Sequence, residues 1–288
     1  MTYGLSGNIT KPEIWEPIAA LVAWLQKKSI PFYIEAAVGA GLLKRDHLSS
    51  EEAARYSRTN LPQETDVILS FGGDGTLLST AYNIGAHQTP ILGVNLGRLG
   101  FLADTEVSNL HDTIRRLEKG EYRIEERMVL ESRYEGPNGP EIQWALNDFV
   151  LERSLMPQLI SIDVLVDGAT LTTYWADGLI ISTPTGSTAY ALSVGGPILA
   201  PGSNAMALTP IAPHTLTVRP LVLPATAIIT AQVKDAPFVF AADGRSTNFG
   251  DAGPQFTIKK AQHTVRLIKL PEQDYFQTLR SKLRWSGR

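Results

Sequence analysis

Several kinds of residue and pattern are missing from this chain, and each absence excludes a class of protein. The 288 residues include no cysteine, which excludes disulfides, thiolate zinc sites and cysteine nucleophiles. No stretch reaches about 18 uninterrupted apolar residues. The first residues, Met1 to Leu5, lack the charged and then apolar pattern of a signal peptide. We therefore expect a cytoplasmic protein without membrane contact.

Positive charge is also scarce. The 26 Lys and Arg residues are outnumbered by 29 Asp and Glu residues, and the formal net charge is −3. Because a protein that binds nucleic acid usually carries a basic patch or stripe, we expect no nucleic-acid partner. The apolar fraction of 43% and the charged fraction of 19% are ordinary for a globular protein, and the length favours two domains or one large one.

The two commonest phosphate-binding motifs, G-x-G-x-x-G and G-x-x-x-x-G-K-[ST], are absent as well. In their place, an apolar run from Val67 to Phe71 leads into Gly72-Gly73-Asp74-Gly75-Thr76, and a helical pattern follows. Such glycines let a backbone approach a ligand closely, and a helix start favours a phosphate. The carboxylate of Asp74 would repel that phosphate unless a metal ion or a proton-transfer role compensates. The plainer alternative is a tight connection with Asp74 as the helix N-cap.

Before about residue 120, strand-like apolar runs alternate with helical patterns, which implies a parallel sheet with helices on its faces. We predict an α/β domain over residues 1–120 that contains the glycine loop. Its predicted strands lie at 3–5, 32–37, 66–71 and 90–95, and its predicted helices lie near 16–25, 51–56, 76–84 and 114–119.

Short alternating runs separated by turn signals follow, and they predict an all-β, sandwich-like domain over residues 121–270. We expect the tail, residues 271–288, to be helical from Asp274 to Arg284 and to pack back on the first domain. The predicted strands lie at 129–134, 149–152, 160–166, 171–174, 179–182, 216–218, 227–233, 238–241, 256–258 and 265–268, with turns at 136–139, 167–168 and 243–244 and a helix at 189–193.

One loop of the β-domain is rich in hydroxyl groups, since Thr183, Thr185, Ser187 and Thr188 lie within six positions. The loop follows an apolar strand and precedes the predicted helix at 189–193, so it presents hydroxyls beside the free N–H groups of a helix start. That surface suits phosphates or ribose hydroxyls. A Ser/Thr-rich capping loop without a ligand is the plainer alternative.

Asn147 and Asp148 stand between two apolar triplets, residues 144–146 and 149–151. An amide and a carboxylate in a buried strand are costly unless they are satisfied. An amide can pair with a purine edge, and a carboxylate can accept both hydroxyls of a ribose. An ordinary turn at a strand end is the alternative.

Taken together, these stretches resemble the NAD kinase family from Tyr3 to about Ile268, with the motifs in the same order. Besides Gly72–Thr76, Leu146–Asp148 and Asp177–Tyr190, the resemblance rests on residues 93–102, 195–199, 213–216 and 219–224. It implies transfer of the γ-phosphate of ATP to the adenosine ribose 2′-hydroxyl of NAD, which makes NADP, with a divalent cation such as Mg²⁺. It also implies a homodimer or homotetramer in which neighbouring subunits help to build the pocket.

The resemblance assigns roles to individual residues. Asp74 is implied as the general base, although its residue chemistry leaves a metal-binding role equally open and identifies no metal ligands. Gly72, Gly73 and Thr76 are implied to line the phosphates, and Thr185 is a further candidate. The implied dinucleotide contacts are Asp74, Gly75, Asn147, Asp148, Asp177, Thr188, Ala189, Tyr190, Ala191, Leu192 and Ser193.

The chain departs from the family pattern at positions where relatives often carry a basic residue. Leu77 and Leu78 follow the glycine loop, and Trp175 stands two positions before Asp177. The cation that meets the pyrophosphate is therefore not identified. Arg245, beside the predicted turn at 243–244, is a candidate, and a solvated turn residue is its alternative role.

Two other functions share part of this pattern. A lipid kinase of the diacylglycerol or sphingosine type has the same glycine loop, but this chain lacks an exposed amphipathic membrane-binding helix and carries Asn147-Asp148. A non-catalytic NAD(H) sensor would bind the dinucleotide, but it has no need of the Asp74 carboxylate. Both remain alternatives to a kinase that acts on NAD.

Overall fold

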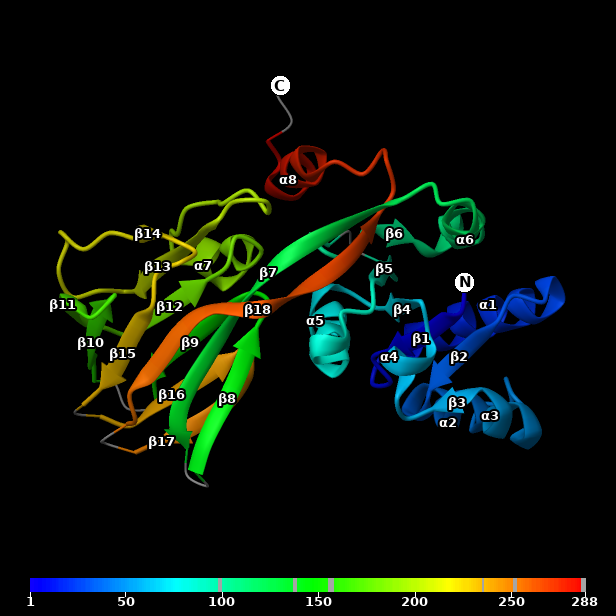
Figure 1. Ribbon diagram of the computed structural model, residues 1–288, viewed down its shortest axis with the longest axis horizontal. Helices are drawn as coiled ribbons and strands as arrows, with labels where there is room; N and C mark the ends of the chain where they lie inside the picture. The colour runs from blue at the N-terminus through cyan, green and yellow to red at the C-terminus, as the bar shows by residue number, and fades with distance from the viewer. Residues whose placement is uncertain (98–99, 137–138, 155–157, 235, 251–252, 286–288) are drawn as a thin grey trace. The chain divides into compact units, whose positions relative to one another are not determined.

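The computed structural model describes residues 1–97, 100–136, 139–154, 158–234, 236–250 and 253–285. The chain forms two compact units, one from residues 1–126 with 265–288 and the other from residues 127–264. Strands β7 (Arg123–Gly136) and β18 (Phe256–Lys269) each begin in one unit and end in the other (Figure 1). The two units are described separately below.

The first unit contains a parallel sheet. Strand β1 (Tyr3–Gly7) pairs with β2 (Phe32–Glu35) on one side and with β4 (Val67–Phe71) on the other. Strand β3 (Ser57–Arg58) extends the sheet beyond β2, and β5 (Ile91–Asn95) pairs with β4 and with β6 (Thr105–Glu106). The end of β18 adds a parallel pair with β5. Every residue of β4 and β5 is buried, as is typical of parallel sheets.

Amphipathic helices connect these strands. Helix α1 buries Ile18, Leu21, Val22 and Leu25 on one face, as their spacing predicts. Within the described residues, no helix is long and apolar enough to cross a membrane. The helical segments of the unit are η1 (Pro12–Ile14), α1 (Trp15–Lys28), α2 (Ala36–Leu43), α3 (Ser50–Tyr56), α4 (Leu61–Glu64), α5 (Asp74–Ile84), η2 (Gly85–His87), η3 (Val107–Asn109), α6 (Leu110–Glu118) and α8 (Tyr275–Leu283).

One sequence prediction for this unit is wrong, and one alternative does not hold. The strand predicted at 32–37 ends at Glu35, and helix α2 follows at once. Glycine lowers helix propensity, so Gly39 and Gly41 argued against a helix. Close packing requires both glycines, because a Cβ at Gly39 would meet Ser57 and a Cβ at Gly41 would meet the ring of Trp15. Helix α5 begins at Asp74 with Gly73 as its N-cap, so Asp74 is not the N-cap.

The second unit consists of antiparallel strands in two layers, as predicted. One layer has the order β14-β13-β12-β9-β16-β17. In the other, β11, β10 and β15 lead to β18, and β8 pairs with β7. The elements are β8 (Gly139–Ala145), β9 (Asp148–Arg153), β10 (Ile160–Val166), β11 (Ala169–Ala176), β12 (Gly178–Ser182), η4 (Gly186–Thr188), α7 (Tyr190–Ser193), β13 (Ala205–Ile211), β14 (Leu221–Pro224), β15 (Ile229–Val233), β16 (Phe238–Ala242) and β17 (Arg245–Phe249).

Aromatic rings fill the core of this unit. The ring of Phe240 stacks on Phe149 with centroids 5.3 Å apart and on Phe256 with centroids 4.3 Å apart. All three side chains are fully buried. Because one of these residues comes from β9, one from β16 and one from β18, the stack joins the two layers.

Several predicted strands of this unit need correction. No strand covers 216–218, where Leu216 is 89% exposed; the strand forms later, as β14. The runs at 256–258 and 265–268 belong to one continuous strand, β18. The turns at 167–168 and 243–244 are confirmed, since Asp167, Gly168, Asp243 and Gly244 all have positive φ. Residues 137–138 of the predicted turn at 136–139, and 98–99 of the stretch at 93–102, lie outside the described residues.

Candidate functional site

The glycine loop of the first unit turns sharply between β4 and α5. Gly72 has a φ of 156°, and a Cβ there would meet the side chain of Thr76, so only glycine fits this position. The Gly72 N–H donates to the carbonyl of Val94 over 2.9 Å, which ties the loop to the end of β5. Gly73 precedes the helix, and Gly75 is exposed beside Asp74. The loop therefore exposes backbone at the start of α5.

Asp74 is a half-buried residue, and its carboxylate binds the loop that follows β5. It accepts hydrogen bonds from the backbone N–H groups of Phe101, Leu102 and Ala103, over 2.8, 3.0 and 3.1 Å. A Cβ at Gly100 would meet the same carboxylate. Three donors occupy three of the roughly four acceptor positions of a carboxylate. One position is left for a further donor, such as a hydroxyl group.

The same loop is also held from its carbonyl side. Lys269, near the end of β18, donates through Nζ to the Leu102 carbonyl over 3.2 Å and to Asp104 Oδ2 over 2.6 Å. The Lys269 and Asp104 side chains are only 5% and 10% exposed. We call residues 100–104 the clamped loop, because Asp74 binds its N–H groups and Lys269 binds its oxygen atoms. Sequence analysis missed Lys269, although a lysine that ends an apolar run suggests a buried partner.

A cavity of about 420 Å³ opens beside the glycine loop. It lies at the carboxyl ends of β1, β4 and β5, where ligands bind in open parallel sheets. Gly72 and Gly73 line it together with Asn95 and the exposed Lys11. Its volume falls in the range of small-molecule sites. The sequence predictions did not include Lys11 either, although its position just after the first strand placed it near this edge of the sheet.

Asp243 organises the candidate site of the second unit. Its side chain is 1% exposed, and it accepts hydrogen bonds from the backbone N–H groups of Leu146, Asn147 and Asp148 over 2.8, 2.7 and 3.2 Å. The Asp243 N–H donates in return to the Asp148 carbonyl over 3.1 Å. The predicted turn at 243–244 thus positions the start of β9, which the sequence alone did not indicate.

Asp148 is a buried acid beside another acid. Asp148 is 6% exposed. Burial raises the pKa of its carboxyl group to about 7, and the charge of Asp243 makes a smaller contribution to the rise. Burial also raises the pKa of Asp243, and the backbone N–H donors act against that rise. Asp148 can therefore gain or lose a proton near neutral pH.

The hydroxyl-rich loop packs onto the same strand start. Thr183 Oγ1 donates to the Leu146 carbonyl over 2.6 Å, and the Thr183 N–H donates to the Asn147 carbonyl over 2.8 Å. Ser187 Oγ donates to the Pro184 carbonyl over 2.6 Å, and Thr188 Oγ1 donates to the Thr185 carbonyl over 3.1 Å. These three hydroxyl groups stabilise the loop itself, as the plainer alternative of a capping loop expects.

The remaining dinucleotide candidates lie around α7. Tyr190 and Ser193 are exposed, Thr188, Ala189 and Leu192 are half-buried, and Ala191 is 1% exposed in a small apolar cluster. Burial and the charges of Glu152, Asp177 and Asp148, in that order, raise the pKa of Tyr190. The structure thus gathers Asp148, Asp177 and Tyr190 in one acidic neighbourhood. Asp177 pairs with Arg153 over 2.6 Å.

The positions without the family's basic residues are occupied as follows. Leu77 is 1% exposed and packs in the core, while Trp175 is 61% exposed. Arg245 donates through Nη2 to the Trp144 carbonyl over 2.8 Å and lies 4.0 Å from Asp243. Arg245 is thus a structural tie at the strand ends rather than a solvated turn residue. Its Nη1 and Nη2 both face groups of its own unit.

No group of three or more His, Asp or Glu side chains that could hold a metal ion occurs among the described residues. N–H groups of the clamped loop already occupy three of the roughly four acceptor positions of the Asp74 carboxylate. This donor set fits a divalent cation that enters with a phosphate ligand, because Mg²⁺ is commonly bound through substrate phosphates and few protein groups.

Comparisons with known proteins show which family the chain resembles over most of its length. The N-terminal domain model of the ATP-NAD kinases matches residues 4–122, and the C-terminal domain model matches residues 146–270. The NAD kinase of Heliobacterium modesticaldum is 41% identical, with 98% of each chain covered. That of Geotalea daltonii is 39% identical, with 93% of each chain covered.

Two solved kinase structures are similar to this chain. The yeast NADH kinase, solved in complex with NADH, has a TM-score of 0.89 and 26% identity, with 100% of this chain and 89% of that chain covered. An NAD kinase from Archaeoglobus fulgidus, solved in complex with ATP, shares the fold with a TM-score of 0.73 at 24% identity, with both chains fully covered.

Proposed function

This chain belongs to the NAD kinase family, and we propose that Asp74 is the base in its phosphorylation of NAD by ATP. In this step the adenosine ribose 2′-oxygen attacks the γ-phosphorus of ATP, and its proton passes to Asp74. The new O–P bond gives NADP, and the bond to the β-phosphate breaks to release ADP. Such transfers depend mainly on alignment and on one group that accepts the hydroxyl proton.

The observation that carries this role is the fixed direction of the Asp74 carboxylate. The three N–H donors of the clamped loop leave one acceptor position for a substrate hydroxyl. Because those donors are backbone groups, the carboxylate does not have to reorganise when the substrate arrives. Asp74 is then both the anchor of the loop and the proton acceptor.

We further propose that the ATP phosphates bind in the cavity at the glycine loop. Gly72, Gly73 and the first turn of α5, which includes Thr76, offer backbone without obstructing side chains. Lys11 lines the same cavity and takes the place of the basic residues that Leu77 and Leu78 do not supply. A divalent cation, Mg²⁺ in our proposal, enters with ATP and neutralises the charge of the phosphates.

Dinucleotide contacts are proposed for each unit by itself, with Asp74 and Gly75 in the first unit and the following residues in the second. The ionised Asp148 carboxylate accepts ribose hydroxyls, and Asn147 and Asp177 take further polar groups of NAD. The acidic neighbourhood around Tyr190 supports this role, because hydroxyl and amide donors of a ligand favour carboxylate acceptors. Thr185, whose Oγ1 accepts a hydrogen bond from Arg127 Nη1 over 3.4 Å, and residues 188–193 complete the proposed surface.

One coupled assay tests the activity. Purified protein with ATP, Mg²⁺ and NAD should form NADP, and diacylglycerol or sphingosine in place of NAD should give no phosphorylated lipid. Binding of NAD without NADP formation would contradict a kinase and support a sensor. The relatives reported above are NAD or NADH kinases, so they give no support to either alternative.

The proposed protein is a cytoplasmic homodimer or homotetramer that supplies NADP. Its support is the family resemblance, which implies pockets that neighbouring subunits help to build. Symmetric assembly through two-fold interfaces is the commonest arrangement of soluble oligomers. Light scattering should give a mass of two or four times 31.4 kDa, and a fully active monomer would contradict the proposal.

A further inference from the structure

A second cavity in the first unit has a volume of about 510 Å³ and is larger than the one at the glycine loop. It lies at the amino end of β2, where the Tyr3 N–H donates to the Pro31 carbonyl over 3.0 Å. The glycine loop follows the carboxyl end of β4, at the opposite edge of the same sheet. Phosphoryl transfer therefore does not account for this cavity, which we call the amino-edge chamber.

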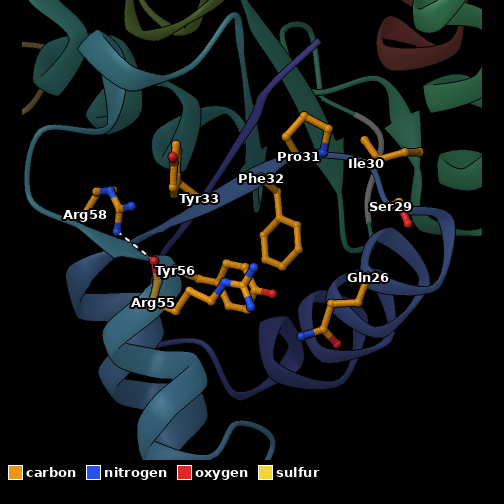
Figure 2. A pocket seen from close by; sticks show the side chains of 9 residues that line it. All are labelled: Gln26, Ser29, Ile30, Pro31, Phe32, Tyr33, Arg55, Tyr56 and Arg58. Atoms are coloured by element: carbon orange, nitrogen blue, oxygen red, sulfur yellow. Dashed lines mark hydrogen bonds between the residues drawn. The ribbon is translucent and has the colours of Figure 1, made fainter.

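Aromatic rings form one wall of the chamber. The rings of Phe32 and Tyr56 stack with centroids 4.5 Å apart and planes inclined by 23°. The Arg55 guanidinium lies over the Tyr56 ring, 5.4 Å from its centroid. Figure 2 shows the side chains of Phe32, Arg55 and Tyr56 gathered in the chamber beside Gln26. Such a wall offers stacking surface to a flat ring.

Two guanidinium groups line the chamber, and one of them is held rigidly. Arg58 lies 3.9 Å from the centroid of the Tyr33 ring, and its Nε donates to Glu64 over 2.7 Å. Its Nη1 donates to the carbonyls of Arg55 and Ser57 over 2.9 and 2.8 Å. The Arg55 side chain makes no hydrogen bond or ion pair within the described part of the chain. Its donors are therefore available to an anion, and guanidinium groups bind phosphate in a bidentate manner.

The other charges near the chamber leave it positive. Glu52 accepts hydrogen bonds from Gln26 and from the capping Ser49, and Glu64 pairs with Arg58. Helices α1 and α3 both end here, and a helix C-terminus carries partial negative charge. Basic residues in their last turns, Lys27 and Lys28 in α1 and Arg55 in α3, offset that charge. This cationic surface is unusual in a chain with a net charge of −3.

We propose that the amino-edge chamber is a second ligand site, which binds a nucleoside monophosphate. The base takes the place of the Arg55 guanidinium over the Tyr56 ring, and Arg55 turns to bind the phosphate together with Arg58. The volume suits a ligand of this size, and the paired ring and cation contacts select a ligand that carries both a flat ring and an anion. This inference does not depend on the assignment of Asp74 or on the identity of the phosphoryl donor.

Calorimetric titration of the protein with 5′-AMP tests the site. Adenosine and inorganic phosphate, which are the two halves of 5′-AMP, are titrated separately for comparison. We expect 5′-AMP to bind the wild-type protein more tightly than either half. Arg55→Met should weaken this binding about tenfold, the usual effect of one charged hydrogen bond, and should leave the KM values for ATP and NAD unchanged. Lys11→Met, at the other cavity, should leave this binding event in place.

Arg45→Met is the matched control, because the Arg45 guanidinium lies 3.9 Å from the Trp15 ring centroid and outside the chamber. Tyr56→Leu provides a second variant that removes the stacking surface, and thermal unfolding checks that each variant is folded. Absence of 5′-AMP binding would overturn the proposal. Titration curves of Arg55→Met that match those of the wild type, or an equal loss in Arg45→Met, would overturn it as well.

Discussion

The two units contain the same device, an aspartate that accepts three backbone N–H groups from a neighbouring segment. Asp74 binds residues 101–103 in the first unit, and Asp243 binds residues 146–148 in the second. Their surroundings differ, since the Asp243 side chain is 1% exposed, whereas Asp74 directly follows Gly73, which lines the cavity at the glycine loop. A carboxylate without access to ligands can only hold structure, whereas an accessible one can also react.

Asparagine substitution should separate these two roles, and Asp74→Asn should have the largest effect. Asparagine cannot accept the hydroxyl proton, so kcat should fall by roughly 10²–10⁴. One side-chain oxygen is also replaced by an NH₂ group that faces N–H donors of the clamped loop. The free energy of unfolding should therefore fall by about 1–3 kcal/mol. Steady-state kinetics and chemical denaturation measure both quantities.

Asp243→Asn is the matched control, because it removes one acceptor oxygen from the same kind of three-donor cluster. We expect a similar loss of stability and a higher KM for NAD, since Asn147 and Asp148 lose a fixed position. If kcat falls as far in Asp243→Asn as in Asp74→Asn, the base assignment of Asp74 is wrong.

Lys269→Met weakens the clamped loop without touching Asp74. It leaves the Asp104 carboxylate, which is 10% exposed, without its cation. Removing one partner of a buried pair costs about 3–5 kcal/mol, so the melting temperature should drop sharply, and kcat should fall because Asp74 loses part of its support. Arg116→Met is the control: its partner Glu272 is 59% exposed, and such pairs contribute at most about 1 kcal/mol. Equal losses in the two variants would contradict the clamp.

Local patterns were sufficient to predict the glycine loop and its flanking elements. Five apolar residues before Gly72 predicted β4, and the unusual carboxylate of Asp74 was recognised from its neighbours in sequence alone. The partners of that carboxylate lie 27 to 29 residues further along the chain. Such contacts depend on which strands become neighbours, and no local pattern encodes them.

The same limit explains why Asp243 was recognised only as a turn residue. Its role arises because β16 pairs with β9 in a register that places Ala242 opposite Phe149. Helix α2 was missed for a different reason, since Gly39 and Gly41 are chosen for close packing and not for helix propensity. The family was therefore predictable from the sequence, while the contacts that hold Asp74 and the start of β9 became visible only in the fold.

Asp148→Asn tests the buried acid of the second unit through pH. Its folded-state pKa of about 7 lies above the ordinary value of 3.8, so between these values the unfolded chain releases a proton that the folded chain keeps. Wild-type stability should therefore decline as pH rises from 4 to 7, by at most about 1.4 kcal/mol per pH unit, and then level off. The variant should lack this contribution, and unfolding curves with the same pH dependence in both proteins would contradict it.

Lys11→Met should have the smallest effect on the enzyme among the variants at the two candidate sites. Lys11 lines the cavity of the glycine loop but is exposed, so solvent screens its interaction with an ATP phosphate. We expect the KM for ATP to rise about threefold to tenfold, the range between a screened surface pair and a charged hydrogen bond. The KM for NAD and the melting temperature should stay near wild-type values, because no described side-chain contact of Lys11 supports the fold. High salt should shrink the difference between variant and wild type. An unchanged KM for ATP at low salt would show that another cation meets the phosphates.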